Sequence, residues 1–250
     1  MTPHRIVLLL LATLALAWGT ARAMTQEEVV AGAEKTYRTR ITDLALAGML
    51  DRDAAFLARV EKIVQRLAAQ AQRDDPAIPV KTWEVHTCND ADDNASSMAG
   101  GKLLLSQAYV ERLSLNDAEL AMVLSHEMQH ALLLHNLKEY EEALRLDPSW
   151  RTRPFADLED AVDNDTALMT KLSSLNWDQE VEADRAGLIL AWRAGWRASA
   201  VAGYFRKLEQ ATSMSHFGSH THPSPLLRWR TARAQAVALD ANRPASSSGE

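Results

Sequence analysis

The sequence has 250 residues, of which 47% are hydrophobic and 24% are charged, enough apolar material for one core of average size or two small domains. This balance excludes a wholly disordered chain. The formal net charge is −6 and no basic stripe stands out, which argues against a nucleic-acid-binding protein.

Residues 1–23 have the features of a secretory signal peptide. Arg5 supplies a positive charge, residues 6–18 are almost wholly apolar, and Ala21 and Ala23 stand at the small-residue positions of a cleavage site. We expect cleavage after Ala23. A membrane anchor is the alternative, but the apolar run is shorter than the roughly 20 residues that a spanning helix needs. The mature chain is therefore expected to be exported, to the periplasm of a Gram-negative cell or to the outside, and to carry no transmembrane segment.

Cys88 is the only cysteine of the sequence. An intramolecular disulfide and a cysteine-based zinc site are therefore both excluded, and any metal site must use histidines and carboxylates. We expect Cys88 to pack as a small apolar residue in a strand. A reactive thiol or an intermolecular disulfide is the alternative.

The chain opens with a helical region over residues 25–72, where apolar residues recur at helical spacing. Gly48 and Asp51 are expected to divide this region into two helices. Residues 80–88 alternate in polarity and are rich in β-formers, which predicts a strand. A glycine-pair turn then leads to a second short strand over residues 103–105.

Further along, the sequence predicts a short helix over residues 107–113. Asn116, followed three residues later by Glu119, has the pattern of a capping box, so a strong helix is expected over residues 118–134. Residues 138–146 continue in helical character.

Residues 147–176 form the least regular part of the pattern, with two prolines and scattered acids. They are expected to be a mobile segment near the site or a plain surface insertion. The elements expected beyond them are helices over residues 179–192, 198–211 and 226–239, a loop over residues 213–225, and a disordered tail over residues 241–250.

The strongest chemical signal is the pentapeptide His126-Glu127-Met128-Gln129-His130. Residues four apart share one face of a helix, so the two imidazoles can bind one ion. Glu127 lies beside them and can reach a water on that ion, which is the zincin arrangement of two ligands and a general base. Incidental histidines on a solvated helix face are the alternative, but this helix is mostly apolar, where unpaired polar groups are costly.

A catalytic zinc site needs a third protein ligand, and Glu180 is the best candidate. Asp184 shares its helical face and can accept a hydrogen bond from a ligand histidine, which fixes the tautomer of that ring. Glu182 should point elsewhere. The alternative is that all three are surface acids.

Three histidines, His216, His220 and His222, gather in the loop over residues 213–225. We favour His222 as a donor to the oxyanion of the reaction or as a residue that approaches the zinc in a resting state. A second metal site and plain surface histidines are the alternatives. His86 and His135 are expected to be structural.

Taken together, these motifs resemble the HtpX/BepA family of gluzincin peptidases, which includes the CAAX prenyl endopeptidases. The matching segments, in chain order, are Asn94 with Gly100-Gly101-Lys102, then residues 126–130, then Glu180-x-x-Ala183-Asp184, then His222-Pro223 with Arg228 six residues beyond the histidine. Their order and approximate spacing agree over residues 80–230, most of the mature chain.

The resemblance implies one zinc ion per chain, held by His126, His130 and Glu180, with Glu127 as the base. It also implies an edge strand near residues 101–106 that pairs with an extended polypeptide substrate. The transmembrane helices of the integral-membrane members have no counterpart here, so the soluble periplasmic members fit better. The segment 95–99 is less aromatic than in that family, which leaves substrate preference open.

The resulting fold prediction is a mostly helical α+β zincin domain over residues 24–240. It has a helical N-terminal part over residues 25–72 and a catalytic part over residues 80–239. We expect a small antiparallel sheet whose edge strand borders the active-site cleft, with zinc between the helix near 117–135 and the helix near 179–192.

The predicted function is that of a zinc-dependent endopeptidase acting on exported or misfolded envelope proteins, in which Glu127 activates a zinc-bound water. One alternative is a latent peptidase that acts mainly as a chaperone-like or assembly-factor binding module. Hydrolysis of something other than peptides is another. The sequence does not indicate an oligomeric state.

Overall fold

The protein is described by a computed structural model over residues 24–219 and 221–242. The expected signal peptide and all but the first two residues of the expected C-terminal tail lie outside the described residues. Among those that are described, no helix combines the length and the apolar character needed to cross a membrane.

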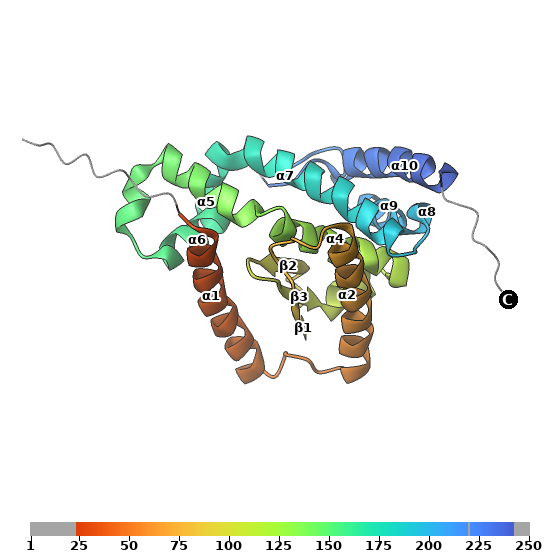
Figure 1. The fold of residues 1–250 in the computed structure, drawn as a ribbon, viewed down its shortest axis with the longest axis horizontal. Helices are drawn as coiled ribbons and strands as arrows, with labels where there is room; N and C mark the ends of the chain where they lie inside the picture. The colour runs from red at the N-terminus through yellow and green to blue at the C-terminus, as the bar shows by residue number, and fades with distance from the viewer. Residues whose placement is uncertain (1–23, 220, 243–250) are drawn as a thin grey trace, which may run out of the picture.

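Two long N-terminal helices, α1 (Gln26–Leu46) and α2 (Ala54–Asp74), stand on either side of a small sheet (Figure 1). Thr25 caps α1 with a capping box, and the Asp53 side chain accepts hydrogen bonds from the first turn of α2. Gly48 and Asp51 both have positive φ in the connection. The predicted division of residues 25–72 into two helices is therefore confirmed.

The sheet has three strands, β1 (Glu84–Cys88), β2 (Ala95–Met98) and β3 (Lys102–Ser106), in the order β1-β3-β2. β2 pairs with β3 antiparallel, whereas β1 pairs with β3 in parallel. The prediction of an antiparallel sheet is thus wrong for one of its two pairings. Cys88 is buried at the end of β1, as expected, and burial raises the pKa of its thiol to about 11.

The strand predicted as the edge, near residues 101–106, is instead the centre of the sheet. Its three consecutive leucines are all buried, so both faces of this strand are covered, as is usual for a central strand. The two edge strands are β1 and β2, and the one that lines the cleft is β2, whose Ser96 and Ser97 tolerate solvent. The hairpin that joins β2 to β3 turns at Gly100 and Gly101, which both have positive φ. A Cβ on Gly101 would lie 2.5 Å from Thr82 O.

A short helix, α3 (Gln107–Arg112), leads to the central helix α4 (Asp117–Leu132). The capping box of Asn116 and Glu119 is present, and residues from Leu120 to Leu124 are all buried. Leu134 adopts the left-handed conformation, which turns the chain into α5 (His135–Leu146) three residues earlier than expected.

Residues 147–176 are helical rather than irregular, so that prediction is wrong. They form a 3₁₀ turn (Pro148–Thr152), α6 (Phe155–Asn164) and the first part of α7 (Thr166–Arg193), a continuous helix of 28 residues. The prolines sit at helix starts, where they are tolerated, and Asp165 caps α7. Buried residues such as Leu158 and Leu172 join a second core cluster with α1 and α5.

The remaining helices are α8 (Ala198–Val201), α9 (Gly203–Ala211) and α10 (Pro225–Ala241), so the helix expected over residues 198–211 is interrupted at Ala202. They pack with α2, α4 and the C-terminal part of α7 into the largest core cluster. Figure 1 shows α7 lying across the molecule above α4, and this crossing positions the candidate site. The mostly helical α+β class is confirmed.

Candidate metal centre

The candidate site lies where α4 and α7 pack against each other. Gly187 of α7 faces the backbone of His126 in α4 so closely that a Cβ at this glycine would lie 2.9 Å from His126 N. The missing side chain lets the two helices approach. As a result, both histidines of α4 meet Glu180, which lies two helical turns before Gly187.

The three predicted ligands converge within hydrogen-bonding distances of one another. His126 Nε2 lies 3.2 Å from His130 Nε2 and 3.4 Å from Glu180 Oε2, and His130 Nε2 lies 3.2 Å from Glu180 Oε1. Ligand atoms bound tetrahedrally to zinc at about 2.0–2.1 Å are about 3.3 Å apart. The spacing of these atoms therefore fits three corners of such a site, and they form a group able to hold a metal ion.

The charge state of the group also fits a cation. Burial disfavours the charged form of Glu180, but His126 and His130 outweigh it and hold the pKa of this carboxyl well below its usual range. Glu180 Oε2 is buried, and no described residue donates it a hydrogen bond of normal geometry. The nearest Arg228 nitrogen is 3.5 Å from Oε2, so this anionic oxygen remains able to bind a metal ion beside two imidazoles, a suitable ligand set for zinc.

Asp184 contacts the ring nitrogen of His126 that is not turned to His130 and Glu180, and Arg228 in turn pairs with Asp184. Asp184 Oδ1 lies 2.9 Å from His126 Nδ1, and Arg228 donates two hydrogen bonds of 2.7 Å to the same carboxylate. With a proton on Nδ1 facing Asp184, the Nε2 lone pair faces Glu180 and His130. The structure thus places Asp184 beside a predicted ligand histidine, and it places Arg228, matched only by family resemblance, beside the site.

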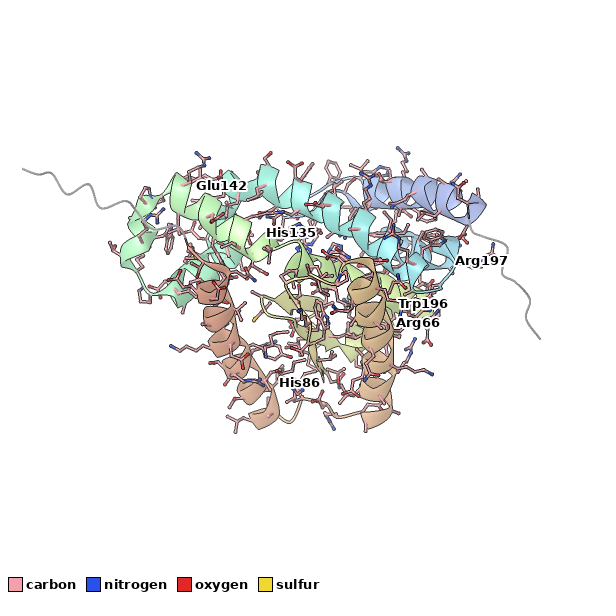
Figure 2. The ribbon with its side chains drawn as sticks, viewed as in Figure 1. Arg66, His86, His135, Glu142, Trp196 and Arg197 are labelled. Atoms are coloured by element: carbon pink, nitrogen blue, oxygen red, sulfur yellow. The ribbon has the colours of Figure 1, made fainter. Side chains whose placement is uncertain are left out.

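His130 has an analogous neighbour that sequence reasoning missed. His135, expected to be only structural, has its Nδ1 3.1 Å from His130 Nδ1 and its Nε2 3.2 Å from Glu182 Oε2. Burial, then the charge of His130, lower the pKa of His135 to about 4, so its ring is neutral near pH 7. The sequence spacing of His130 and His135 does not predict this contact, because it depends on the left-handed turn at Leu134, which brings the His135 ring back towards His130. Figure 2 shows His135 beneath α7.

Glu127 lies next to His126 and lines the same cleft as the edge strand β2. Burial raises the pKa of the Glu127 carboxyl, while the His126 and His130 charges and a hydrogen bond with Ser97 of β2 act in the other direction. A carboxylate with a raised pKa, beside a group able to hold a metal ion, is suited to accept a proton from water.

Among the loop histidines, the structure brings only His222 to the group, as far as the described residues go. Its Nε2 lies 3.4 Å from Glu180 Oε2, and its Nδ1 lies 2.7 Å from Thr221 Oγ1. The exposed His216 shows no contact with this group, and His220 lies outside the described residues. His86 lies far from the metal group (Figure 2). Its Nδ1 instead contacts the carboxylate of Asp51, which is consistent with a structural residue.

A cleft of about 1050 Å³ passes over this group. The part of its wall nearest to the group comes from β2, from the α4 face that carries Glu127, and from the loop that carries His222, and further lining residues come from α1, α5, α6 and α7. The expectation that a sheet edge borders the cleft therefore agrees with the structure, although the strand at that edge is β2.

The comparisons with known proteins agree with this geometry. The peptidase family M48 matches residues 57–236. The "Beta-barrel assembly-enhancing protease" of Yersinia pestis is 30% identical over 179 residues, which cover 66% of this chain and 37% of the relative. The same-named protein of Escherichia coli K12 is 29% identical, covering 59% and 33%, and the mitochondrial "Metalloendopeptidase OMA1" of Bos taurus is 26% identical, covering 70% and 34%. The chain thus spans about a third of the length of these relatives.

Proposed function

The chain belongs to peptidase family M48 and has the domain of a metalloendopeptidase, and from this we propose that it is a zinc-dependent endopeptidase with one zinc ion per chain. The convergence of His126, His130 and Glu180 in a cleft is the observation that carries the proposal. Their spacing fits zinc, as does the buried Glu180 Oε2, which accepts no hydrogen bond from a described residue, and we assign these residues as its ligands. We further propose that residues 24–240 form one domain.

Zinc in such a site supplies Lewis acidity, which favours attack by water at neutral pH and polarises a peptide carbonyl. Glu127 takes the proton of the attacking water and passes it to the leaving amine. Asp184 and Arg228 keep His126 in the ligand tautomer. His222 is placed to donate a hydrogen bond to the oxyanion from the open side of the cleft.

We propose that polypeptide substrates bind as an extended strand along β2. This strand pairs with β3 on one side only, so its other backbone edge is available for hydrogen bonds to a peptide. Its residues line the same cleft as Glu127. The scissile bond of a peptide in this position would lie close to the metal group.

The substrates we propose are exported or misfolded envelope proteins, in the periplasm of a Gram-negative cell. Two supports are the signal-peptide pattern of residues 1–23 and the relatives whose names refer to β-barrel assembly. Sequencing the N-terminus of protein recovered separately from periplasmic and cytoplasmic extracts tests the compartment. A chain starting at Met24 supports export, whereas a chain retained with residues 1–23 in the cytoplasm contradicts it.

A second function, that of a latent peptidase acting mainly as a chaperone-like binding module, is favoured by the position of His222. Because its Nε2 lies 3.4 Å from Glu180 Oε2, this ring is close enough to compete for the open metal position. The variant His222→Ala separates the two roles. A rise in peptide cleavage supports latency, and a fall supports oxyanion stabilisation.

The metal content of the purified mature protein tests the main proposal, with casein cleavage measured on the same samples. We expect about one zinc per chain in the wild type and in Glu127→Gln, but loss of zinc in Glu180→Ala. Only the wild type should cleave casein. Asp178→Asn, an exposed acid on the same helix, is the matched control and should retain both zinc and activity. A folded wild type without zinc would contradict the proposal.

A further inference from the structure

The cleft has a branch that the proposed chemistry does not use. We use the name branch for the lining residues that come from α5, α6 and α7, which include Glu139, Glu159, Asp163 and Asn176. Asn176 precedes Glu180 by one helical turn, so the two side chains share a face of α7. The branch therefore opens directly beside the proposed metal centre.

The branch is rich in hydrogen-bond acceptors and poor in cations. Asp160 adds a fourth carboxylate to those of Glu139, Glu159 and Asp163. Along the part of the cleft wall that the structure describes, Arg228 is the sole lysine or arginine, and its guanidinium is already paired with Asp184. The carboxylates of the branch thus have no cationic partner among the lining residues.

An unpaired amide oxygen points to a ligand independently of these acids. Asn176 is only 7% exposed, and its Oδ1 is buried with no hydrogen-bond partner among the described residues. Its side chain also forms a hydrogen bond with Glu139, which leaves the oxygen as the free group. Asn136 Oδ1, on the same wall, is likewise buried and unpaired. Buried acceptors of this kind need a donor.

The charges of the branch favour a cationic hydrogen-bond donor, and its apolar walls favour a donor with an apolar stem. Burial, followed by the charge of Asp163, raises the pKa of Glu139 to about 8, and burial also raises the pKa of Glu159. A cation in the branch would relieve this unfavourable environment. Ala33, Ala99 and Tyr140 provide apolar wall surface, which suits a methylene stem.

We propose that this branch is the specificity subsite for an arginine or lysine side chain of the bound peptide. The head group brings several N–H donors and a positive charge to a surface of carboxylates and amide oxygens, and the stem packs on the apolar walls. The inference deepens the proposed endopeptidase function and rests on it. Peptides with a basic residue close to the scissile bond should then be the preferred substrates.

The test compares arginine with citrulline, its neutral analogue of nearly the same shape, at each position of a fluorescent peptide. Binding is measured by anisotropy to zinc-loaded Glu127→Gln, so the peptide stays intact. At one position, arginine should bind roughly tenfold more tightly than citrulline, since hydrogen-bonded charges are strong in partly buried sites. Adding Glu139→Gln should reduce this ratio towards one.

Asp157→Asn, on the exposed face of α6 outside the branch, is the matched control and should keep the preference. Asn176→Leu, which removes the unpaired oxygen, is a second variant in case Glu139→Gln does not fold. Equal binding of arginine and citrulline at every position would overturn the subsite. So would a preference that survives both branch variants.

Cleavage of the same peptides by the wild type separates the subsite from the function. Cleavage without an arginine preference overturns the subsite alone. An arginine preference in binding, without cleavage by the zinc-loaded wild type, supports the subsite and counts against the endopeptidase. If calcium alone stabilises the wild type but not Glu139→Gln, and arginine is not preferred, the branch binds a metal cation and the subsite proposal is wrong.

Discussion

The two histidines of α4 differ in what faces their second ring nitrogen. His126 Nδ1 faces Asp184, an acid held by Arg228, whereas His130 Nδ1 faces the neutral ring of His135. If His130 binds zinc through Nε2, its Nδ1 carries a proton that His135 Nδ1 accepts, and His135 Nε2–H then donates to Glu182. His135 is therefore a positioning residue in our proposal.

Replacing His135 should weaken zinc binding. His135→Leu removes the acceptor and leaves the proton of His130 Nδ1 buried and unpaired, and we expect about a 10- to 100-fold loss of zinc affinity. His135→Asn places an amide oxygen close to the former Nδ1 position, so it should recover part of the loss. Competition with a zinc-binding dye measures both. Equal affinity in His135→Leu and the wild type would contradict this role.

Glu139 should make folding stability depend on pH. Its pKa is raised from 4.5 to about 8, so between these values the folded chain holds a proton that the unfolded chain has lost, and stability falls as pH rises. The variant Glu139→Gln has no proton to lose at this position, so its stability should not fall over this pH range. We expect the variant to be more stable than the wild type by about 1–2 kcal/mol near pH 8.5 and equal to it near pH 4.

Thermal melts of the metal-free proteins at the two pH values check this prediction. Asp157→Asn, an exposed acid of the neighbouring helix, should show no such difference. A Glu139→Gln variant that is less stable than the wild type at high pH would show that the carboxylate is well accommodated. It would then also weaken the argument for an unsatisfied acidic branch.

At the scale of elements, the approach of α4 and α7 decides whether the ligands can meet. Gly187 has no room for a side chain against the backbone of His126. Gly187→Val should push the helices apart, lower the stability by about 2–3 kcal/mol, and cost zinc binding. Ala167→Val on the exposed part of α7 is the control and should bind zinc normally. Zinc titration with circular dichroism melts measures both effects.

The sheet shows a second way in which elements place the chemistry. The hairpin at Gly100 and Gly101 turns β2 back along β3, and β3 takes the buried centre because its leucines are apolar on both faces. β2 is thereby left as the edge that borders Glu127. The serines of β2 make a poor buried strand but a suitable surface for pairing with a peptide backbone.

At the scale of the whole molecule, the metal would connect two parts of the fold. α4 belongs to the largest core cluster, whereas the N-terminal part of α7 packs in the second cluster with α1, α5 and α6. The proposed ligands come from both helices, so zinc bound there would stabilise their packing and would bind the folded state only. Removal of the metal should therefore lower the melting temperature.

A zinc concentration of 100 times the dissociation constant contributes about 2.7 kcal/mol, which corresponds to roughly 5–10 °C in a chain of this size. Melts of the wild type before and after chelation measure the difference. Glu180→Ala should melt at the same temperature in both conditions. A wild type whose melting temperature is unchanged by chelation would contradict the proposed ligand set.

Much of the site could be read from local spacing alone. The pentapeptide from His126 to His130 and the pair Glu180 and Asp184 owe their common faces to helix periodicity, which is the same in any fold. The capping box at Asn116 and the break between α1 and α2 are also local signals. These features required no knowledge of the tertiary structure, because each depends on residues within a few positions of one another.

The tertiary structure decided what depends on contacts between distant residues. The role of β2 as the edge, the place of His135 beside His130, and the acidic branch at Glu139 all arise from segments far apart in the sequence or from a single left-handed turn. The helices in residues 147–176 were missed because two prolines and scattered acids suggested breaks, although Leu158, Ala161 and Val162 recur at helical spacing and pack against α1 and α5. Periodicity determines which side chains share a face, whereas packing determines what that face meets.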